Sequence, residues 1–115
     1  MHPWSILLVD DDQDIMEALA LALRGPFIVQ TARSAADATA ILVERHIDVL
    51  VSDYDLGSGG SGKALLDYAA ARFPSVRRIL YSGSLVAPIA SAQAVVQKPD
   101  IVTLIKVISN MKPID

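Results

Sequence analysis

The sequence predicts an α/β fold, a doubly wound parallel sheet of five strands with helices on both faces. Short, continuous apolar runs alternate with segments of helical periodicity, which is typical of parallel strands that helices cover on both sides. Four of these runs end directly in polar residues. The chain has 115 residues, of which 52% are hydrophobic and 20% charged, so we expect one domain over residues 1–115 with a sizeable core.

Strands and helices alternate in the first half of the chain. A strand is expected where an apolar run is short and continuous, and a helix where apolar residues recur every three or four positions behind a capping Asp or Ser. The expected elements are a strand at 5–9, a helix at 12–24, a strand at 27–31, a helix at 34–45 and a strand at 47–52.

The second half continues this order but contains one weak element. Between residues 84 and 94 only about one or two helical turns fit, and Pro88 restricts them further. The fourth of five helices is therefore expected to be shortened. The other expected elements are a loop at 55–62, a helix at 63–72, strands at 76–81 and 94–97, and a last helix that Asp100 caps.

Four of the expected strands run directly into polar side chains, namely Asp10, Asp11, Asp53, Ser82 and Lys98. Parallel strands all finish on the same side of their sheet, so the fold should gather these side chains at one rim. Like-charged groups about 4 Å apart repel by about 4 kcal/mol at an effective dielectric constant of about 20, and a hard cation such as Mg²⁺ offsets this repulsion. A carboxylate there can attack a phosphoryl group whose oxygens a lysine and a hydroxyl contact.

These residues lie in four segments that resemble the signature segments of the receiver domains of two-component response regulators. The segments stand in the family's order at the ends of four expected strands, and the resemblance covers nearly the whole chain. The flavodoxin-like fold of that family agrees with the predicted sheet. The segments are Ile6-Leu-Leu-Val-Asp-Asp-Asp12, Asp48-Val-Leu-Val-Ser-Asp53, Ile79-Leu-Tyr-Ser-Gly83 and Lys98-Pro99.

The resemblance implies a phosphoacceptor signalling domain rather than a classical enzyme. Asp53 would accept the phosphoryl group, and Asp10 and Asp11 would hold Mg²⁺ together with Asp53 and the backbone carbonyl of Asp55. The domain would catalyse its own phosphorylation and dephosphorylation and signal by a conformational change. Asp12 is expected to cap the first helix rather than bind the metal.

The remaining two site residues would contact the phosphoryl group. Ser82 corresponds to the hydroxyl residue of the family's switch, and Lys98 to its invariant lysine, which precedes a proline that is often cis. The implied donor is a phosphohistidine on a sensor histidine kinase or a histidine phosphotransfer protein. The output partner stays unknown, and a homodimer is left open.

The sequence departs from the family's pattern in four places. Val95 stands where the family usually has an aromatic residue that turns inward on phosphorylation. Only 16 positions separate Ser82 from Lys98, where about 20 are expected with a full fourth helix. Gly57 replaces a common proline, and the Gly/Ser-rich stretch behind it is expected to be mobile. Asp55 adds a fourth carboxylate beside the site.

Two other functions compete with this interpretation. Residues 57–63 fit the G-x-x-x-x-G-K pattern of a phosphate-binding P-loop between a strand and a helix. Ala64 follows, where such a loop needs Ser or Thr to hold Mg²⁺, so a nucleotide-binding domain is the weaker alternative. The other is a pseudo-receiver, an interaction module that works without phosphorylation, and the complete set of Asp, Ser and Lys residues argues against it.

The composition excludes several classes of protein. A net charge of −3 gives no basic field of the kind that nucleic-acid binding requires. The absence of cysteine excludes disulfides, thiolate metal sites and thiol nucleophiles. No apolar run reaches the roughly 18 residues of a membrane span and no secretory signal is recognised, so we expect a cytoplasmic location. A stand-alone regulator and a receiver from a longer or hybrid protein both remain open.

Overall fold

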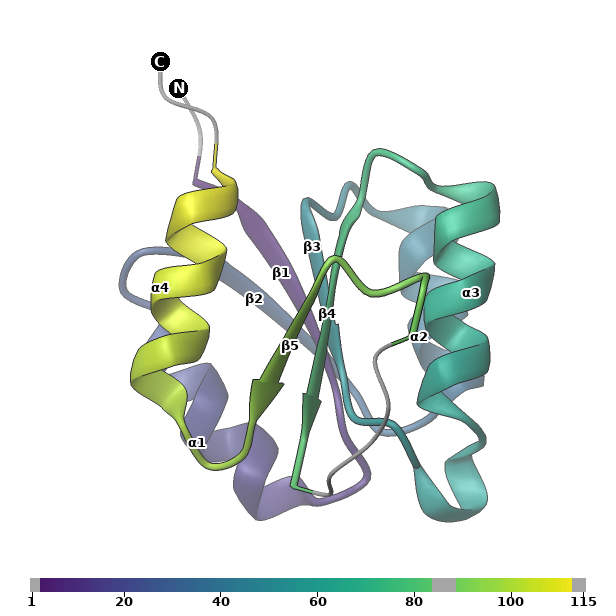
Figure 1. Cartoon of the computed structure of the whole chain (residues 1–115), viewed down its shortest axis with the longest axis horizontal. Coiled ribbons are helices and arrows are strands. Elements are labelled where there is room, and N and C mark those ends of the chain that lie inside the picture. Colours follow the sequence, from purple (N-terminus) through teal and green to yellow (C-terminus); the bar gives the residue numbers. More distant parts are fainter. Residues whose placement is uncertain (1–2, 84–88, 113–115) are drawn as a thin grey trace.

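The computed structural model describes residues 3–83 and 89–112, in which strands and helices alternate in the expected order as far as the fourth strand (Figure 1). The strands are β1 (Ser5–Val9), β2 (Ile28–Ala32), β3 (Val49–Ser52), β4 (Arg77–Ser82) and β5 (Ala94–Gln97). The helices are α1 (Gln13–Leu23), α2 (Ala35–Glu44), α3 (Gly62–Arg72) and α4 (Ile101–Met111), with a 3₁₀ turn at Gly57–Gly59.

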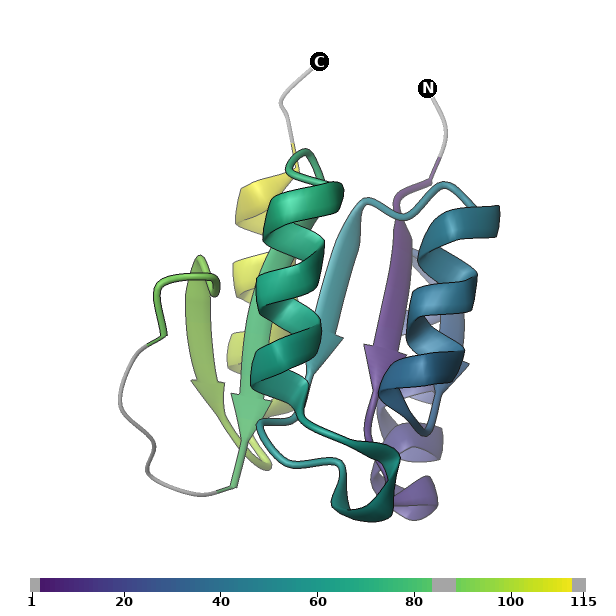
Figure 2. The same cartoon turned by 90° about the vertical axis from the view of Figure 1, so that its right-hand side faces the viewer.

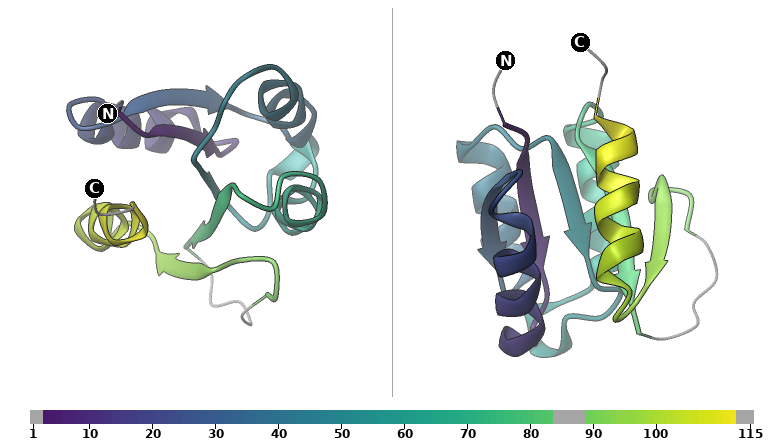
Figure 3. Two further views of the ribbon diagram at one scale, coloured as in Figure 1. Left: turned by 90° about the horizontal axis from the view of Figure 1, so that it is seen from above. Right: turned by 90° about the vertical axis from the view of Figure 1, so that its left-hand side faces the viewer.

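All five strands run parallel in one sheet, in the order β2-β1-β3-β4-β5. Helices α1 and α4 cover one face and α2 and α3 the other (Figure 3), and Figure 2 shows α2 and α3 side by side in front of the sheet. The predicted doubly wound architecture is confirmed. The strand order reverses between β1 and β3, and ligands on such sheets bind at the carboxyl ends of the strands beside that reversal.

Each face of the sheet has its own hydrophobic core. Neighbouring residues of β1 point to opposite faces, so Ile6 packs in the cluster that contains Ile108 of α4, and Leu7 packs in the cluster that contains Leu66 of α3. The central strands β1 and β3 are almost wholly buried, whereas Ile28 on the edge strand β2 is exposed. The continuous apolar runs of the sequence therefore mark the central strands.

Side chains predicted as caps begin three helices. Asp12 accepts hydrogen bonds from the backbone N–H groups of Asp14 and Ile15 at the start of α1, and Ser34 and Asp100 cap α2 and α4 in the same way. The cap role of Asp12 is confirmed. In the described part of the chain, no helix is both long enough and apolar enough to cross a membrane.

The link between β4 and β5 differs most from expectation. The short fourth helix expected there falls partly on residues 84–88, outside the described residues, and residues 89–93 contain one turn and no helix. Arg78 of β4 holds this segment: its Nε donates to the carbonyl of Ser91 at 2.7 Å. The backbone N–H of Arg78 also donates to Oε1 of Gln93 at 2.9 Å. These bonds fix the described part of the link against the sheet without helical structure.

Candidate functional site

The polar strand ends converge on one cleft of about 470 Å³ at the carboxyl edge of the sheet. A larger groove of about 1080 Å³ runs over the edge of the sheet at the end of β2 and is flanked by α1 and α2. It contains none of the residues predicted for the site, so we place the site in the smaller cleft. The smaller cleft brings together every site residue predicted from the sequence, namely Asp10, Asp11, Asp53, Asp55, Ser82 and Lys98.

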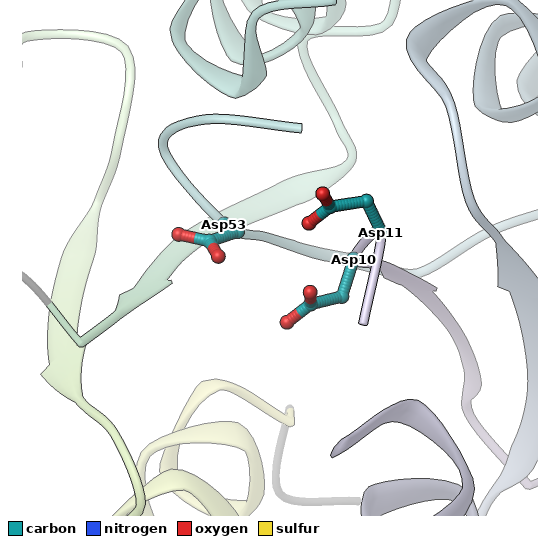
Figure 4. Close-up of side chains that lie close together, drawn as sticks. All are labelled: Asp10, Asp11 and Asp53. Carbon is teal, nitrogen blue, oxygen red and sulfur yellow. The ribbon is translucent and has the colours of Figure 1, made fainter. Parts of the chain in front are cut away.

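Three carboxylates lie at the centre of this cleft. One oxygen from each of Asp10, Asp11 and Asp53 lies within 4.8 Å of the others, and Figure 4 shows the three side chains beyond the ends of β1 and β3. The backbone fixes two of them, because the N–H of Asp10 donates to the carbonyl of Ala32 at 3.2 Å and that of Asp53 to Val9 at 3.1 Å. Clustered carboxylate oxygens are the hard ligands that Mg²⁺ prefers.

Lys98 lies between two of these carboxylates. Its Nζ donates to Oδ2 of Asp10 at 2.5 Å and to Oδ2 of Asp53 at 2.8 Å. Burial acts to lower the pKa of Lys98, but the hydrogen bonds to the two carboxylates and the attraction of their negative charges together outweigh it, so the pKa is raised above its ordinary value. The ammonium is therefore charged at neutral pH and neutralises part of the acidic cluster.

Ser82 lines the cleft from the end of β4, beside Lys98. The backbone N–H of Lys98 donates to the carbonyl of Ser82 at 3.0 Å, and Ser82 is buried. The peptide bond between Lys98 and Pro99 is cis. A hydroxyl and an ammonium thus lie on adjacent strand ends of one cleft, where both can contact the same anion.

Asp55 is built into the loop that borders the cleft. Its Oδ1 accepts the N–H of Gly57 at 2.8 Å, and its backbone forms an antiparallel bridge with Ser61. Gly57 has a φ of 61°, and a Cβ there would lie 2.8 Å from Oδ2 of Asp11, so glycine lets the loop approach that carboxylate. The Gly/Ser-rich stretch that we expected to be mobile is folded into a hydrogen-bonded turn.

The same turn argues against a P-loop, in which backbone N–H groups surround a phosphate. The N–H groups of Gly59, Gly60 and Gly62 instead donate to backbone carbonyls of residues 54–57. Lys63 pairs with Asp67 at 2.9 Å on the exposed side of α3. These donors are engaged within the protein, so the turn does not favour the P-loop alternative.

Gly62 is a residue of the site that the sequence did not single out. It is the buried first residue of α3, and a Cβ added there would lie 1.6 Å from the backbone carbonyl oxygen of Asp53. Only glycine lets α3 begin against the backbone of Asp53. The sequence carries no signal for this contact, because Gly62 is one of several glycines in the same short segment.

The family model of the response regulator receiver domain matches residues 6–109. The chain belongs to this family. Over 95 residues this receiver domain is 36% identical to the photosynthetic apparatus regulatory protein RegA of Cereibacter sphaeroides, a match that covers 81% of this chain and 50% of RegA. Over 79 residues it is 33% identical to the hydrogenase transcriptional regulatory protein HoxA of Cupriavidus necator, covering 69% of this chain and 16% of HoxA. The chain therefore spans half or less of these two relatives.

A solved structure shares the whole fold. The signal receiver domain of an HD domain-containing protein from Pseudomonas fluorescens Pf-5 matches with a TM-score of 0.87 and 26% identity, over 95% of this chain and 94% of that one. This receiver domain is accordingly a signalling domain of two-component systems rather than a classical enzyme. Receiver domains bind Mg²⁺ at an acidic pocket, and the carboxylates of Asp10, Asp11 and Asp53 form a cluster that could hold a metal.

Proposed function

We propose that Asp53 of this receiver domain accepts a phosphoryl group from a phosphohistidine, and that Asp10, Asp11, Asp53 and the backbone carbonyl of Asp55 hold Mg²⁺. The observation that carries this proposal is the position of Lys98, whose ammonium lies 2.8 Å from Oδ2 of Asp53 inside the acidic cleft. A cation fixed beside the acceptor is what the oxygens of a phosphoryl group require.

The chemistry follows from the positions of these side chains. Bound Mg²⁺ offsets the repulsion between the carboxylates and the oxygens of the incoming phosphoryl group. An oxygen of Asp53 forms a bond to phosphorus while the phosphorus–nitrogen bond of the donor breaks and its electron pair returns to the imidazole. Lys98 then pairs with one phosphoryl oxygen, and the hydroxyl of Ser82 donates to another.

The same site supports the reverse of this modification by hydrolysis. Water attacks phosphorus, the bond from phosphorus to the Asp53 oxygen breaks, and inorganic phosphate leaves while the carboxylate is regenerated. Asp11 and Asp55, which are exposed in the structure, border the solvent side of the cleft. The domain thereby catalyses both its own phosphorylation and its own dephosphorylation.

The donor that we propose is a sensor histidine kinase or a histidine phosphotransfer protein. Receiver domains interact with such proteins, and both carry the phosphohistidine that the chemistry above requires.

We also propose that residues 1–115 form a single domain, since one sheet and its two cores use all of the described elements. We further propose a cytoplasmic location, where ATP is available to phosphorylate such a donor.

The intact mass of the protein after incubation with phosphoramidate and Mg²⁺ tests the proposed function. We expect one phosphoryl group, stable in acid and labile in base, on the wild-type protein. Asp53→Asn removes the attacking oxygen and should carry none, and neither should the wild-type protein without metal. Asp37→Asn, a matched loss of one carboxylate on α2, should be phosphorylated like the wild type. A folded wild-type protein that gains no phosphoryl group and binds no beryllofluoride would support the pseudo-receiver instead.

Mg²⁺ is expected to raise the melting temperature of the wild-type protein, because the folded state alone gathers the carboxylates. At tenfold excess over its Kd, the metal should stabilise the fold by about 1.4 kcal/mol, or about 5 °C for a domain of this size. Asp11→Asn removes one ligand and should reduce this rise to less than about half.

Differential scanning calorimetry with and without Mg²⁺ measures the rise in melting temperature of the wild type and of Asp11→Asn. Asp37→Asn is again the control for the loss of one negative charge. Equal metal-dependent rises in Asp11→Asn and Asp37→Asn would contradict the assigned ligand.

A further inference from the structure

Tyr81 is a buried aromatic residue that the proposed chemistry does not use. It directly precedes Ser82 on β4, and its side chain is 2% exposed in the core cluster that also contains Leu104 of α4. Successive strand residues point to opposite faces of the sheet. The ring therefore lies on the side of α1 and α4, directly behind a residue that lines the cleft.

The ring also contacts the lysine of the site. Nζ of Lys98 lies 5.9 Å from the centroid of the Tyr81 ring, within the range of a cation–π interaction. The same ammonium pairs with Asp10 and Asp53, and the side chain of Lys98 is only 11% exposed, so solvent screens these contacts weakly. Any displacement of the ammonium must alter its contact with the ring.

A small cavity of about 100 Å³ lies beside this contact. Apart from Lys98, the residues that line this cavity are almost entirely apolar. They belong to α1, to the end of β4 and to the segment that leads from Lys98 into α4. The lining includes Ile15, Leu19, Tyr81, Lys98, Pro99 and Ile101. A ring that moves toward this space changes its packing against both helices, because close-packed cores respond to displacement in discrete rearrangements.

The outer edge of the sheet has no equivalent ring at the position where the family usually places one. Val95 on β5 is aliphatic and 48% exposed. An aliphatic side chain has no aromatic quadrupole to attract an ammonium group. The aromatic contact of Lys98 in this chain is therefore with Tyr81 of β4, on the face of the sheet that α1 and α4 cover.

We propose that Tyr81 positions the Lys98 ammonium and passes its displacement on phosphorylation to α1 and α4. This inference rests on the proposed roles of Asp53 and Lys98. Before phosphorylation, two carboxylates and the ring hold the ammonium. Once Asp53 carries a phosphoryl group, the ammonium turns toward the phosphoryl oxygens, its contact with the ring weakens, and the ring repacks toward the cavity. The conformational signal thus leaves through the face of α1 and α4.

Beryllofluoride with Mg²⁺, a phosphoryl analogue, is the probe for this proposal. Tyr81→Leu removes the ring and Tyr81→Phe keeps it, while Val96→Ala, paired with Tyr81 on β5 in the same core cluster, is the control for lost packing. Calorimetry should show binding strengthened about three- to tenfold in Tyr81→Leu, because the cation–π contact that the wild-type protein loses on binding is already absent. The amide shifts that the probe induces in α4 should also be smaller in Tyr81→Leu, and both other variants should behave like the wild type.

A second measurement uses only the wild-type protein, so it does not depend on whether a variant folds. In wild-type protein labelled at tyrosine, the ring resonances of Tyr81 should move on addition of Mg²⁺ and beryllofluoride, and those of Tyr68 on α3 should not. Unmoved Tyr81 resonances, or a Tyr81→Leu protein that binds and responds like Val96→Ala, would overturn the proposal. A wild-type protein that does not bind the probe at all would overturn the proposed function itself.

Discussion

Replacing Gly62 by alanine is expected to lower the free energy of unfolding by about 3 kcal/mol and to slow phosphorylation of Asp53. The added Cβ would lie 1.6 Å from the carbonyl oxygen of Asp53 and 2.9 Å from Oγ of Ser52. The closer neighbour is backbone, which cannot rotate away as a side chain can. Either α3 or the end of β3 must shift, and a shift at the end of β3 moves the Asp53 carboxylate relative to Lys98.

Gly25→Ala is the matched control for this substitution. No atom lies within 4 Å of a Cβ added at Gly25, which follows α1. Its free energy of unfolding should change by no more than about 0.5 kcal/mol, and its phosphorylation should be unchanged. Urea denaturation and the phosphoramidate reaction measure the two properties. If Gly62→Ala matched Gly25→Ala in both stability and phosphorylation, the assigned close approach of α3 to Asp53 would be contradicted.

Replacing Lys98 by alanine should destabilise the metal-free protein by about 2 kcal/mol, because it leaves the buried carboxylate of Asp10 without its counter-ion. Asp10 is 4% exposed, and the ammonium of Lys98 bridges it to Asp53. Saturating Mg²⁺ should restore most of the lost stability by supplying positive charge at the same place. Asp53 should still accept a phosphoryl group, but the amide shifts that beryllofluoride induces in α4 should be lost.

Lys63→Ala provides the comparison for Lys98→Ala. Lys63 pairs with Asp67 on α3, and each side chain is 47% exposed, so loss of this pair should cost less than about 0.5 kcal/mol. Urea denaturation with and without Mg²⁺ separates the two lysines. Equal stability losses in the two variants, or an unchanged response of α4 in Lys98→Ala, would contradict the role that we assign to Lys98.

Most of the fold could be predicted because its central elements depend on local patterns. The run that forms β1 is apolar at every position after Ser5, and it needed no knowledge of its neighbours. Element bounds were less predictable, since they depend on pairing partners. We expected the third strand to begin at residue 47, but β3 begins at Val49. Just before it, the side chain of Asp48 accepts the backbone N–H of Ser5 at 2.8 Å.

The candidate site divides in the same way. The convergence of Asp10, Asp53 and Lys98 could be predicted because strand ends gather wherever a parallel sheet forms. The contacts of Gly62 and Tyr81 could not, because each joins residues whose separation along the chain matches no helical or strand period. The link held by Arg78 is a third case, since nothing in its local sequence shows that a strand residue would fix it.

By itself, the sequence determined the order of strands and helices, the caps, and the acidic rim of the sheet, because apolar periodicity and the direction of parallel strands decide these features. Only the tertiary structure decided which glycine contacts Asp53, which aromatic ring contacts Lys98, and how the described part of the link before β5 is held. Those features depend on distances of a few ångströms between packed elements. Such distances follow from how the two cores fill space rather than from any local pattern.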